Sequence, residues 1–300
     1  MKRIYIVSNS ASGVTENSRA FDESLAYLES TYDCTNLSIA EILDRESMNA
    51  RITTDQPELI VAAGGDGTVN AAANIAVLHD ITLAVLPTGT FNHFAKHMQI
   101  PREGSEAIKL IDAGHTSMFD VGEINGQYFV NFISLGIYRA IISRRVKYQK
   151  EGYAKLTAFF HAIMEVLFWY KKVTMHFETD SDNLVKEAQL VFIGNGTYTF
   201  GSSDILHERT LPQEGTIHLT FLSASNRITM LFRLIASFFT DIKKLPGITS
   251  LHLEKCTIRT QNERIGVVVD GEVLSFANPL EISVVPKALR VIVPQDLTQN

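Results

Sequence analysis

The sequence predicts a two-domain protein, with an N-terminal Rossmann-like α/β domain and a C-terminal antiparallel β-sandwich. The chain has 300 residues, which is long for a single hydrophobic core. Up to about residue 120, short apolar strands alternate with helical patterns, as they do in parallel α/β units. After Asp120 the strands follow one another without regular helical crossovers. That change of texture favours an antiparallel sheet and places a domain boundary near residue 120.

The first domain is expected to contain three clear strands and three helices. Apolar runs predict the strands at 4–8, 59–63 and 81–86. Helical spacing of apolar residues predicts the helices at 16–30, 69–78 and 91–98. Pro101 marks the end of the last of these helices.

The second domain is expected to consist of short strands interrupted by two helical insertions. The strands are predicted at 127–133, 173–178, 190–194, 216–222 and 264–270. The first insertion carries apolar residues at helical spacing from Leu156 to Tyr170. The second is expected at about 228–239.

Composition restricts the classes of function. The chain has 27 basic and 33 acidic residues and a net charge of −6, which argues against nucleic acid as the main partner. Cys34 and Cys256 form no metal-binding or redox spacing, which is consistent with a reducing cytoplasm. No stretch reaches the roughly 18–20 apolar residues that a membrane-spanning helix needs.

The most informative segment is Gly64-Gly65-Asp66-Gly67-Thr68, which joins an apolar strand to a helix. Glycines at this position let backbone N–H groups approach a phosphate, and the helix dipole favours its negative charge. Asp66 would repel a bare phosphate, so a bound cation or a sugar hydroxyl is its expected partner. The alternative interpretation is a glycine-rich turn in which Asp66 caps the following helix.

Two further loops of small residues, at 9–13 and 87–90, follow strands of the same domain. Loops after parallel strands converge at one edge of an open sheet, so the three loops together predict a cradle for a triphosphate. The signatures of P-loop enzymes, dinucleotide-binding folds, zinc hydrolases and serine hydrolases do not occur in this sequence.

The order of several motifs resembles that of bacterial diacylglycerol-kinase-like lipid kinases, a family that includes sphingosine and ceramide kinases. The motifs are Gly64 to Asn70, Leu86 to Ala95, Asp120 to Gly122, Phe129 to Asn131, and Asp270-Gly271-Glu272. The resemblance covers essentially the whole chain. It implies an ATP cleft enclosed by the two domains, with residues 1–120 and about 285–300 in the first domain and 121–284 in the second.

The resemblance also implies roles for individual residues. The matching nucleotide-binding residues are Asn9, Ser12, Gly13, Ser38, Gly64, Gly65, Asp66, Gly67, Thr68, Val69, Asn70 and Thr90. Glu272 matches the general base that accepts the proton of the acceptor hydroxyl. Without the resemblance, Asp270-Gly271 reads as a hairpin turn. In an NAD-kinase-like interpretation Asp66 would be the catalytic base instead.

This sequence departs from the family pattern at several positions. Ser10 stands where members usually have proline, and His93 and Ala71 stand where acidic residues are frequent. A structural Mg²⁺ site of the family appears here as Gln213-Glu214-Gly215. Its implied ligands are the Glu214 side chain and the carbonyl groups of Leu211 and Thr216. One carboxylate fewer would weaken this site.

The sequence therefore predicts a cytoplasmic, ATP- and Mg²⁺-dependent lipid kinase, with an acceptor such as diacylglycerol. An NAD-kinase-like phosphotransferase and a catalytically inactive nucleotide- or lipid-binding regulator are the alternatives. We expect no nucleic-acid partner, and a homodimer stays open. The enzyme is expected to contact the membrane peripherally through the basic residues from Arg139 to Lys155 and through the aromatic–lysine pairs Trp169-Tyr170-Lys171-Lys172 and Phe238-Phe239 with Lys243-Lys244.

Overall fold

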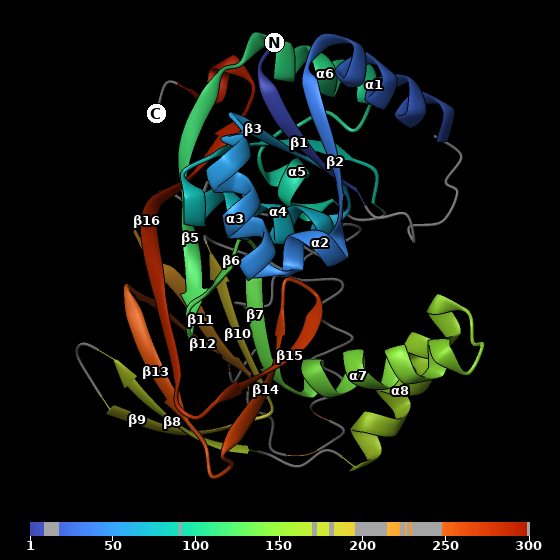
Figure 1. Cartoon of the computed structure of the whole chain (residues 1–300). Helices are drawn as coiled ribbons and strands as arrows, with labels where there is room; N and C mark the ends of the chain where they lie inside the picture. The colour runs from blue at the N-terminus through green and yellow to red at the C-terminus, as the bar shows by residue number, and fades with distance from the viewer. Residues whose placement is uncertain are drawn as a thin grey trace. The chain divides into compact units, whose positions relative to one another are not determined.

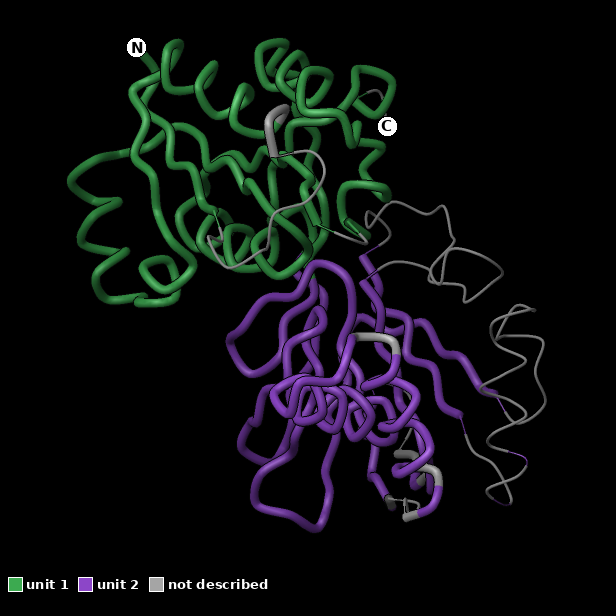
Figure 2. Tube along the Cα trace, turned by 90° about the vertical axis from the view of Figure 1, so that its right-hand side faces the viewer, with its two compact units in different colours: residues 1–121, 286–300 green, residues 122–285 purple. Residues whose placement is uncertain are grey.

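The computed structural model divides the chain into two compact units (Figure 2). Unit 1 comprises Met1–Val121 and Pro286–Asn300, and unit 2 comprises Gly122–Val285. The structure describes residues 1–8, 18–89, 92–169, 173–179, 183–195, 215–222, 226, 229 and 248–298.

Unit 1 is built around a parallel sheet. Its strand order is β2 (Asp33–Ser38), β1 (Arg3–Ser8), β3 (Leu59–Gly64), β4 (Thr82–Pro87) and the end of β16 (Leu280–Ile292). The central strands are almost continuously apolar and buried, as expected when helices cover both faces of a sheet.

Helices pack on both faces of this sheet. The helices of unit 1 are α1 (Ser18–Thr31), α2 (Ile39–Leu43), α3 (Arg45–Asp55), α4 (Asp66–His79), α5 (His93–His97) and α6 (Gly104–Ala113). Leu28 of α1 and Ile108 of α6 share a buried cluster with Ile6 and Val61 of the sheet. The small-residue helix α4 packs its buried alanines closely against β3 and β4. This arrangement confirms the Rossmann-like α/β prediction.

The register of the strands brings their carboxyl ends to one edge. Ser8 of β1 pairs with Ala63 of β3, and Gly64 of β3 pairs with Pro87 of β4. The connections that follow these strands therefore leave the sheet at the same edge, where ligands bind in open α/β sheets.

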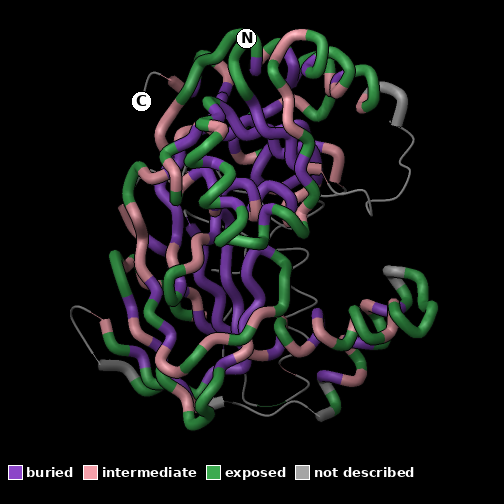
Figure 3. Tube along the Cα trace, in the orientation of Figure 1, coloured by how far each residue is buried: buried purple, intermediate pink, exposed green. Residues whose placement is uncertain are grey.

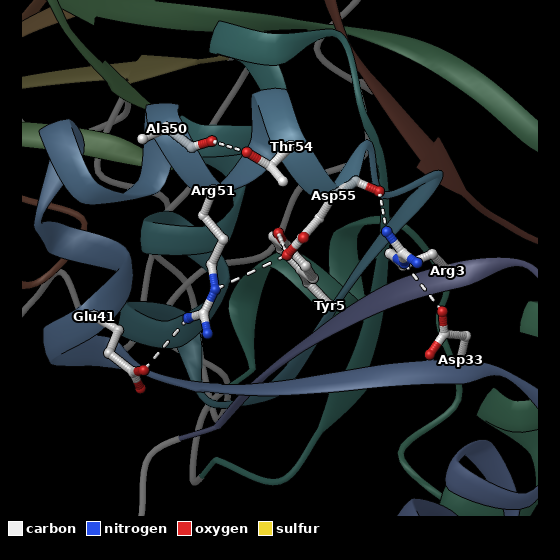
Figure 4. Close-up of polar contacts among 8 residues, drawn as sticks. All are labelled: Arg3, Tyr5, Asp33, Glu41, Ala50, Arg51, Thr54 and Asp55. Carbon is white, nitrogen blue, oxygen red and sulfur yellow. Dashed lines mark hydrogen bonds and ion pairs between the residues drawn. The ribbon is translucent and has the colours of Figure 1, made fainter.

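A polar network fixes the other end of β1 (Figure 4). The Tyr5 hydroxyl donates to Asp55 Oδ2 at 2.7 Å, and Arg3 Nη1 donates to the Asp55 carbonyl at 2.8 Å. Burial, together with this bond to Asp55, raises the pKa of Tyr5. Arg3 also pairs with Asp33, and Arg51 with Asp55. The network attaches α3 to β1 and β2, so the sheet end opposite the loops is a fixed scaffold.

Unit 2 contains two sheets of antiparallel strands. One has the order β12 (Ile248–Leu253), β11 (Ile217–Leu222), β10 (Leu190–Asn195), β7 (Phe132–Gly136), β14 (Arg264–Val269) and β15 (Glu272–Ala277). The other joins the start of β16 to β13 (Lys255–Arg259), β8 (Val173–Thr179) and β9 (Asn183–Ala188). A short hairpin pairs the end of β5 (Thr116–Ile124) with β6 (Gln127–Phe129).

The core of unit 2 lies between these sheets. Side chains of both, including Ile133, Val191 and Val267 from one and Phe177, Ile258 and Ile282 from the other, form one buried cluster. Figure 3 shows the central strands of each unit as largely buried, whereas edge strands such as β2 and β15 are mostly intermediate or exposed. The β-sandwich prediction is therefore confirmed.

The first helical insertion is a helical hairpin. It consists of α7 (Ile137–Lys150) and α8 (Lys155–Trp169), which project from the sheet edge in Figure 1. Both helices pack on Leu190 and Leu222. The sequence predicted only the second of them as part of an apolar helical pattern. The second predicted insertion, 228–239, lies outside the described residues except for Thr229.

Two predicted elements differ from the structure by more than two residues at an end or by a division. The predicted strand 127–133 is divided into β6 and β7, because the N–H groups of Val130 and Asn131 between them donate to the Asp270 side chain instead of to a neighbouring strand. The helix predicted at 69–78 begins earlier, at Asp66, since Gly65 is its N-cap. Among the described residues, no helix is long and apolar enough to cross a membrane.

Candidate active site

The connection from β3 to α4 presents a helix N-terminus without a capping side chain. Gly65 is the N-cap residue, and no described side chain accepts a hydrogen bond there. The first backbone N–H groups of a helix have no partner within the helix, so they and the helix dipole form a site for an anion. A side chain on Gly64 is excluded, because its Cβ would lie 2.3 Å from Thr68 Oγ1.

The connection from β4 to α5 touches the first loop through glycine backbone. A Cβ on Gly89 would lie 2.5 Å from the Gly65 Cα atom, and Thr88 N donates to the Gly64 carbonyl at 3.1 Å. Asn92, in the left-handed region with φ 51°, donates its side-chain amide to the Gly89 carbonyl at 2.8 Å. The two loops therefore form one rigid backbone surface.

Asp66 also connects the two loops, through its side chain. Its Oδ1 accepts a hydrogen bond from the backbone N–H of Phe94, at 3.2 Å, in the first turn of α5. The alternative interpretation from sequence, in which Asp66 caps the helix that follows it, is not what the structure shows. The carboxylate instead caps α5, which begins 27 residues further along the chain.

Ser38 has a structural role that the sequence analysis did not consider. Its hydroxyl accepts from Glu41 N at 3.3 Å, and its backbone N–H donates to Glu41 Oε2 at 2.8 Å. This reciprocal pair is a capping box at the start of α2. These bonds lower the pKa of Glu41. A nucleotide contact by Ser38 stays a prediction, and it would compete with the cap.

Unit 2 carries its candidate residues on a tight hairpin between β14 and β15. Val269 pairs with Glu272, so Asp270 and Gly271 form a two-residue turn. Both have positive φ, 45° and 94°, which is the geometry of a type I′ turn. The structure therefore contains the hairpin turn. This turn is compatible with Glu272 as a site residue, because it places Glu272 at the first position of β15.

The Asp270 carboxylate holds this turn against the start of β7. Its two oxygens accept hydrogen bonds from the backbone N–H groups of Val130, Asn131 and Phe132, at 2.8, 2.9 and 2.7 Å. Asp270 N also donates to the Phe132 carbonyl at 2.9 Å. Asp270 is buried, and a buried carboxylate with several N–H donors is strongly held.

Glu272 differs from Asp270 in its surroundings. The residue keeps an exposed surface, but partial desolvation of its carboxyl raises the pKa of Glu272 above the ordinary value. A raised pKa makes a carboxylate a better proton acceptor while it is still ionised near neutral pH. The neighbouring carboxylates thus differ in their structural roles, since Asp270 fixes the backbone and Glu272 remains exposed.

Several predicted site residues cannot be placed. Asn9, Ser12, Gly13, Thr90, Leu211 and Glu214 lie outside the described residues. Of the three residues implied as metal ligands, only Thr216 lies within the described residues. Within the described ranges no group of three or more histidine, cysteine or acidic residues is arranged to hold a metal.

The sequence analysis missed two contributions to the site. Asn92 was named only as part of the motif from Leu86 to Ala95. In the structure its side-chain amide donates to the Gly89 carbonyl, and its buried Oδ1 has no partner among the described residues. The sequence analysis treated Asp270 as a turn residue and did not anticipate its three backbone donors. The left-handed conformation of both residues is typical of Asn and Asp, which is a signal, but a weak one.

Comparison with known proteins follows the same division of the chain. Residues 3–124 match the diacylglycerol kinase catalytic domain, and residues 132–293 match the YegS C-terminal NAD kinase beta sandwich-like domain. A Staphylococcus aureus (strain Newman) protein named "Putative lipid kinase" is 27% identical over 246 residues, which is 80% of this chain and 78% of that protein.

Solved structures share the fold. A structure described as "a putative diacylglycerol kinase" from Bacillus anthracis str. Sterne has a TM-score of 0.74, 24% identity and 98% coverage of both chains. Another diacylglycerol kinase structure from this organism has a TM-score of 0.72 and 23% identity, covering 99% of this chain and 98% of that one. At this identity the likeness establishes the fold. The two matched domain models, which together span most of the sequence, show that the chain belongs to the diacylglycerol-kinase-like family of lipid kinases.

Proposed function

We propose that this protein transfers the γ-phosphate of ATP to a hydroxyl group of a lipid such as diacylglycerol. The observation that carries the proposal is the position of Glu272. It is a carboxylate of raised pKa at the first residue after a turn that Asp270 fixes through three backbone hydrogen bonds. Phosphoryl transfer to an alcohol needs a positioned base and a phosphate cradle, and the family membership supplies the reaction class.

The described part of unit 1 fits a nucleoside triphosphate. The α4 N-terminus is free of a capping side chain, and Gly65 and Gly89 let the two loops that flank it pack closely together. Phosphate oxygens would accept from the first N–H groups of α4. The buried Asn92 Oδ1, which has no partner, offers an acceptor for a donor group of the nucleotide or for a water beside it.

Mg²⁺ is the cation that this chemistry requires. When bound, it neutralises the charge of the triphosphate and of the transition state. Asp66 is the described carboxylate at the phosphate loop, so we propose that it would hold Mg²⁺. Because Asp66 Oδ1 also accepts from Phe94 N, the same side chain orients the α5 loop.

Glu272 performs the proton transfer. Its carboxylate accepts the proton of the lipid hydroxyl while the hydroxyl oxygen forms its bond to the γ-phosphorus and ADP leaves. Asp270 holds the turn in the geometry that this step needs, and its three N–H donors fix the position of its carboxylate. Asp270 acts through the backbone, so it is a positioning residue.

The test is a transfer assay with labelled ATP and three acceptors: diacylglycerol, a total bacterial lipid extract and NAD. Products are identified by mass spectrometry, and the Glu272→Gln variant is the matched control. We expect a phosphorylated lipid with the wild-type protein and almost none with the variant. Phosphorylation of NAD alone would replace the proposal with an NAD-kinase activity. Absence of transfer to all acceptors, with ATP bound, would indicate a catalytically inactive nucleotide-binding protein.

A further inference from the structure

The α7–α8 hairpin exposes an apolar stripe that the core of unit 2 does not use. Phe160, Met164 and Phe168 of α8 are 62%, 45% and 66% exposed. Their spacing of four residues puts them on one face of the helix. Large apolar side chains gathered on one exposed face indicate an interaction surface, whereas scattered ones do not.

The opposite face of α8 already accounts for its attachment to the protein. Ala158, Ala162 and Val166 are buried, and Ala162 and Val166 pack with Ile137 and Ile141 of α7. The helix therefore has two apolar faces, of which the fold covers one. Packing within unit 2 explains why the first face is apolar. It does not explain why the exposed stripe is apolar.

Aromatic side chains with polar atoms gather near the turn between the helices. The rings of Tyr148, Tyr153 and His161 lie with centroids 5.4–5.7 Å apart. Tyr153 and His161 are exposed, and the Tyr148 hydroxyl donates to Glu165 at 3.0 Å. Rings with an apolar body and a polar edge are typical of the boundary between water and the acyl region of a bilayer.

The net charge of the hairpin indicates which kind of partner binds to this surface. The hairpin, residues 137–169, carries six basic and two acidic residues, which leaves 21 basic and 31 acidic residues in the remainder of the chain. Both acidic residues are paired, since Glu165 lies 3.4 Å from Arg144 and Glu151 lies 3.8 Å from Lys147. An acidic protein thus has a hairpin with an excess of four positive charges.

We propose that the stripe of Phe160, Met164 and Phe168 inserts into the surface of an anionic lipid bilayer, with the basic residues of the hairpin on the head groups. An exposed apolar stripe on an element with an excess of basic residues binds in this way, and each basic residue near an anionic surface adds to the attraction. A second copy of the chain fits less well, because a symmetric contact would bring two positively charged hairpins together. The proposal rests on the proposed function, since a lipid acceptor resides in such a surface.

The experiment measures binding to vesicles in the absence of ATP. Wild type, the double variant Phe160→Ser/Phe168→Ser and the control Leu43→Ser are sedimented with vesicles of phosphatidylglycerol and phosphatidylcholine, and with phosphatidylcholine alone. Leu43 is the matched control because it is also 62% exposed, in unit 1. Circular dichroism verifies that each variant is folded.

We expect wild type and Leu43→Ser to bind the anionic vesicles equally, and binding to weaken as salt rises. The double variant should bind at least about tenfold more weakly, because two large apolar side chains no longer leave water. Transfer to a short-chain, water-soluble diacylglycerol should stay unchanged in that variant.

Equal vesicle binding by the double variant and wild type, or no binding by wild type, overturns the proposal. A dimer that strengthens with salt and is lost in the double variant, without vesicle binding, would assign the stripe to a second copy instead. Because binding is measured without ATP, its result is independent of the enzymatic one. Wild type that binds vesicles but phosphorylates no lipid refutes the proposed function and leaves the surface standing.

Discussion

The loop between β3 and α4 in unit 1 and the turn between β14 and β15 in unit 2 both combine glycine with a carboxylate at the end of a strand. The two regions use these residues differently. In unit 1, Gly64 is required because Thr68 occupies the space of a Cβ atom. In unit 2, nothing lies within 4 Å of the corresponding position on Gly271, and its φ of 94° is the constraint. Glycine serves close approach in one turn and backbone conformation in the other.

The carboxylates differ in the same way. Asp66 is half-buried and accepts one backbone N–H, from Phe94. Asp270 is buried and accepts three. Similar short motifs therefore have different structural roles: the glycines of unit 1 let two loops pack closely together, whereas the turn of unit 2 fixes the position of Glu272. Substitutions at equivalent positions should separate these roles.

The largest effect is expected from Glu272→Gln. The substitution preserves size and hydrogen bonding but removes the ability to accept a proton near neutral pH, so the transfer step should slow by roughly 10²–10⁴-fold. ATP affinity should change little. Because the folded protein raises the pKa of Glu272, ionisation of this residue opposes folding, and the variant should be at least as stable as wild type at neutral pH. Single-turnover experiments measure the transfer rate, and urea unfolding measures the stability. An unchanged transfer rate would show that Glu272 is not the base.

Asp270→Asn should cost the most stability. Asparagine places an N–H₂ group opposite a buried backbone N–H that now donates to a carboxylate oxygen, and it removes a charge that three donors compensate. We expect a loss of about 2–3 kcal/mol in the free energy of unfolding. Asp66→Asn is the matched control, with one donor at stake and a loss of about 1 kcal/mol.

Urea unfolding of the two aspartate variants decides whether the carboxylates differ as the structure indicates. Equal losses would contradict the comparison. In the transfer assay, Asp66→Asn should impair the handling of Mg·ATP, whereas Asp270→Asn should reduce transfer through the displaced Glu272.

Alanine at the two glycines should have effects of different kinds. Gly64→Ala places its Cβ 2.3 Å from Thr68 Oγ1, so the start of α4 must move and nucleotide affinity should fall sharply. Gly271→Ala meets no neighbouring atom, and only the positive φ is strained, at about 1–2 kcal/mol. Isothermal titration with ATP and thermal unfolding measure the two outcomes. If Gly271→Ala lost ATP binding but kept its stability, the roles assigned to the two glycines would be contradicted.

The pH dependence of transfer should show the smallest effect. A base must be ionised to accept a proton, so kcat/KM should fall as pH drops through the pKa of Glu272. Since burial raises that pKa, the acid limb should lie above the usual range of a glutamate and shift with the surroundings of Glu272. A profile measured on a water-soluble diacylglycerol tests this. An acid limb in the range of an unperturbed carboxylate would assign it to another group.

The sequence predicted those parts of the molecule whose cause is local. Gly64 to Thr68 follows an apolar strand, so the position of the connection between β3 and α4 could be found without a structure. The strand β2 was not predicted, because Leu37 is its only buried residue and the rest of its sequence is polar. The capping box of Ser38 and Glu41 is a local pattern that could have been found.

The missed parts of the site depend on contacts distant in sequence. The three backbone donors to Asp270 are 138 to 140 residues away from it, and no periodicity or motif spacing encodes such a pairing. The division between β6 and β7 has the same cause. Exposure of Phe160 and Phe168 could not be predicted either, since the apolar spacing of α8 is compatible with either face pointing inward.

The strand β16 makes the completion of unit 1 depend on the prior synthesis of unit 2. Its early residues pair with β13, and Val291 near its end pairs with Leu83 of β4. On the ribosome, residues 1–121 emerge well before this strand, so the nascent α/β sheet has an unpaired β4 edge until unit 2 has been made. Open sheet edges are where chains pair wrongly. The sheet that carries the phosphate loop is therefore finished only after the unit that carries Glu272 has left the ribosome.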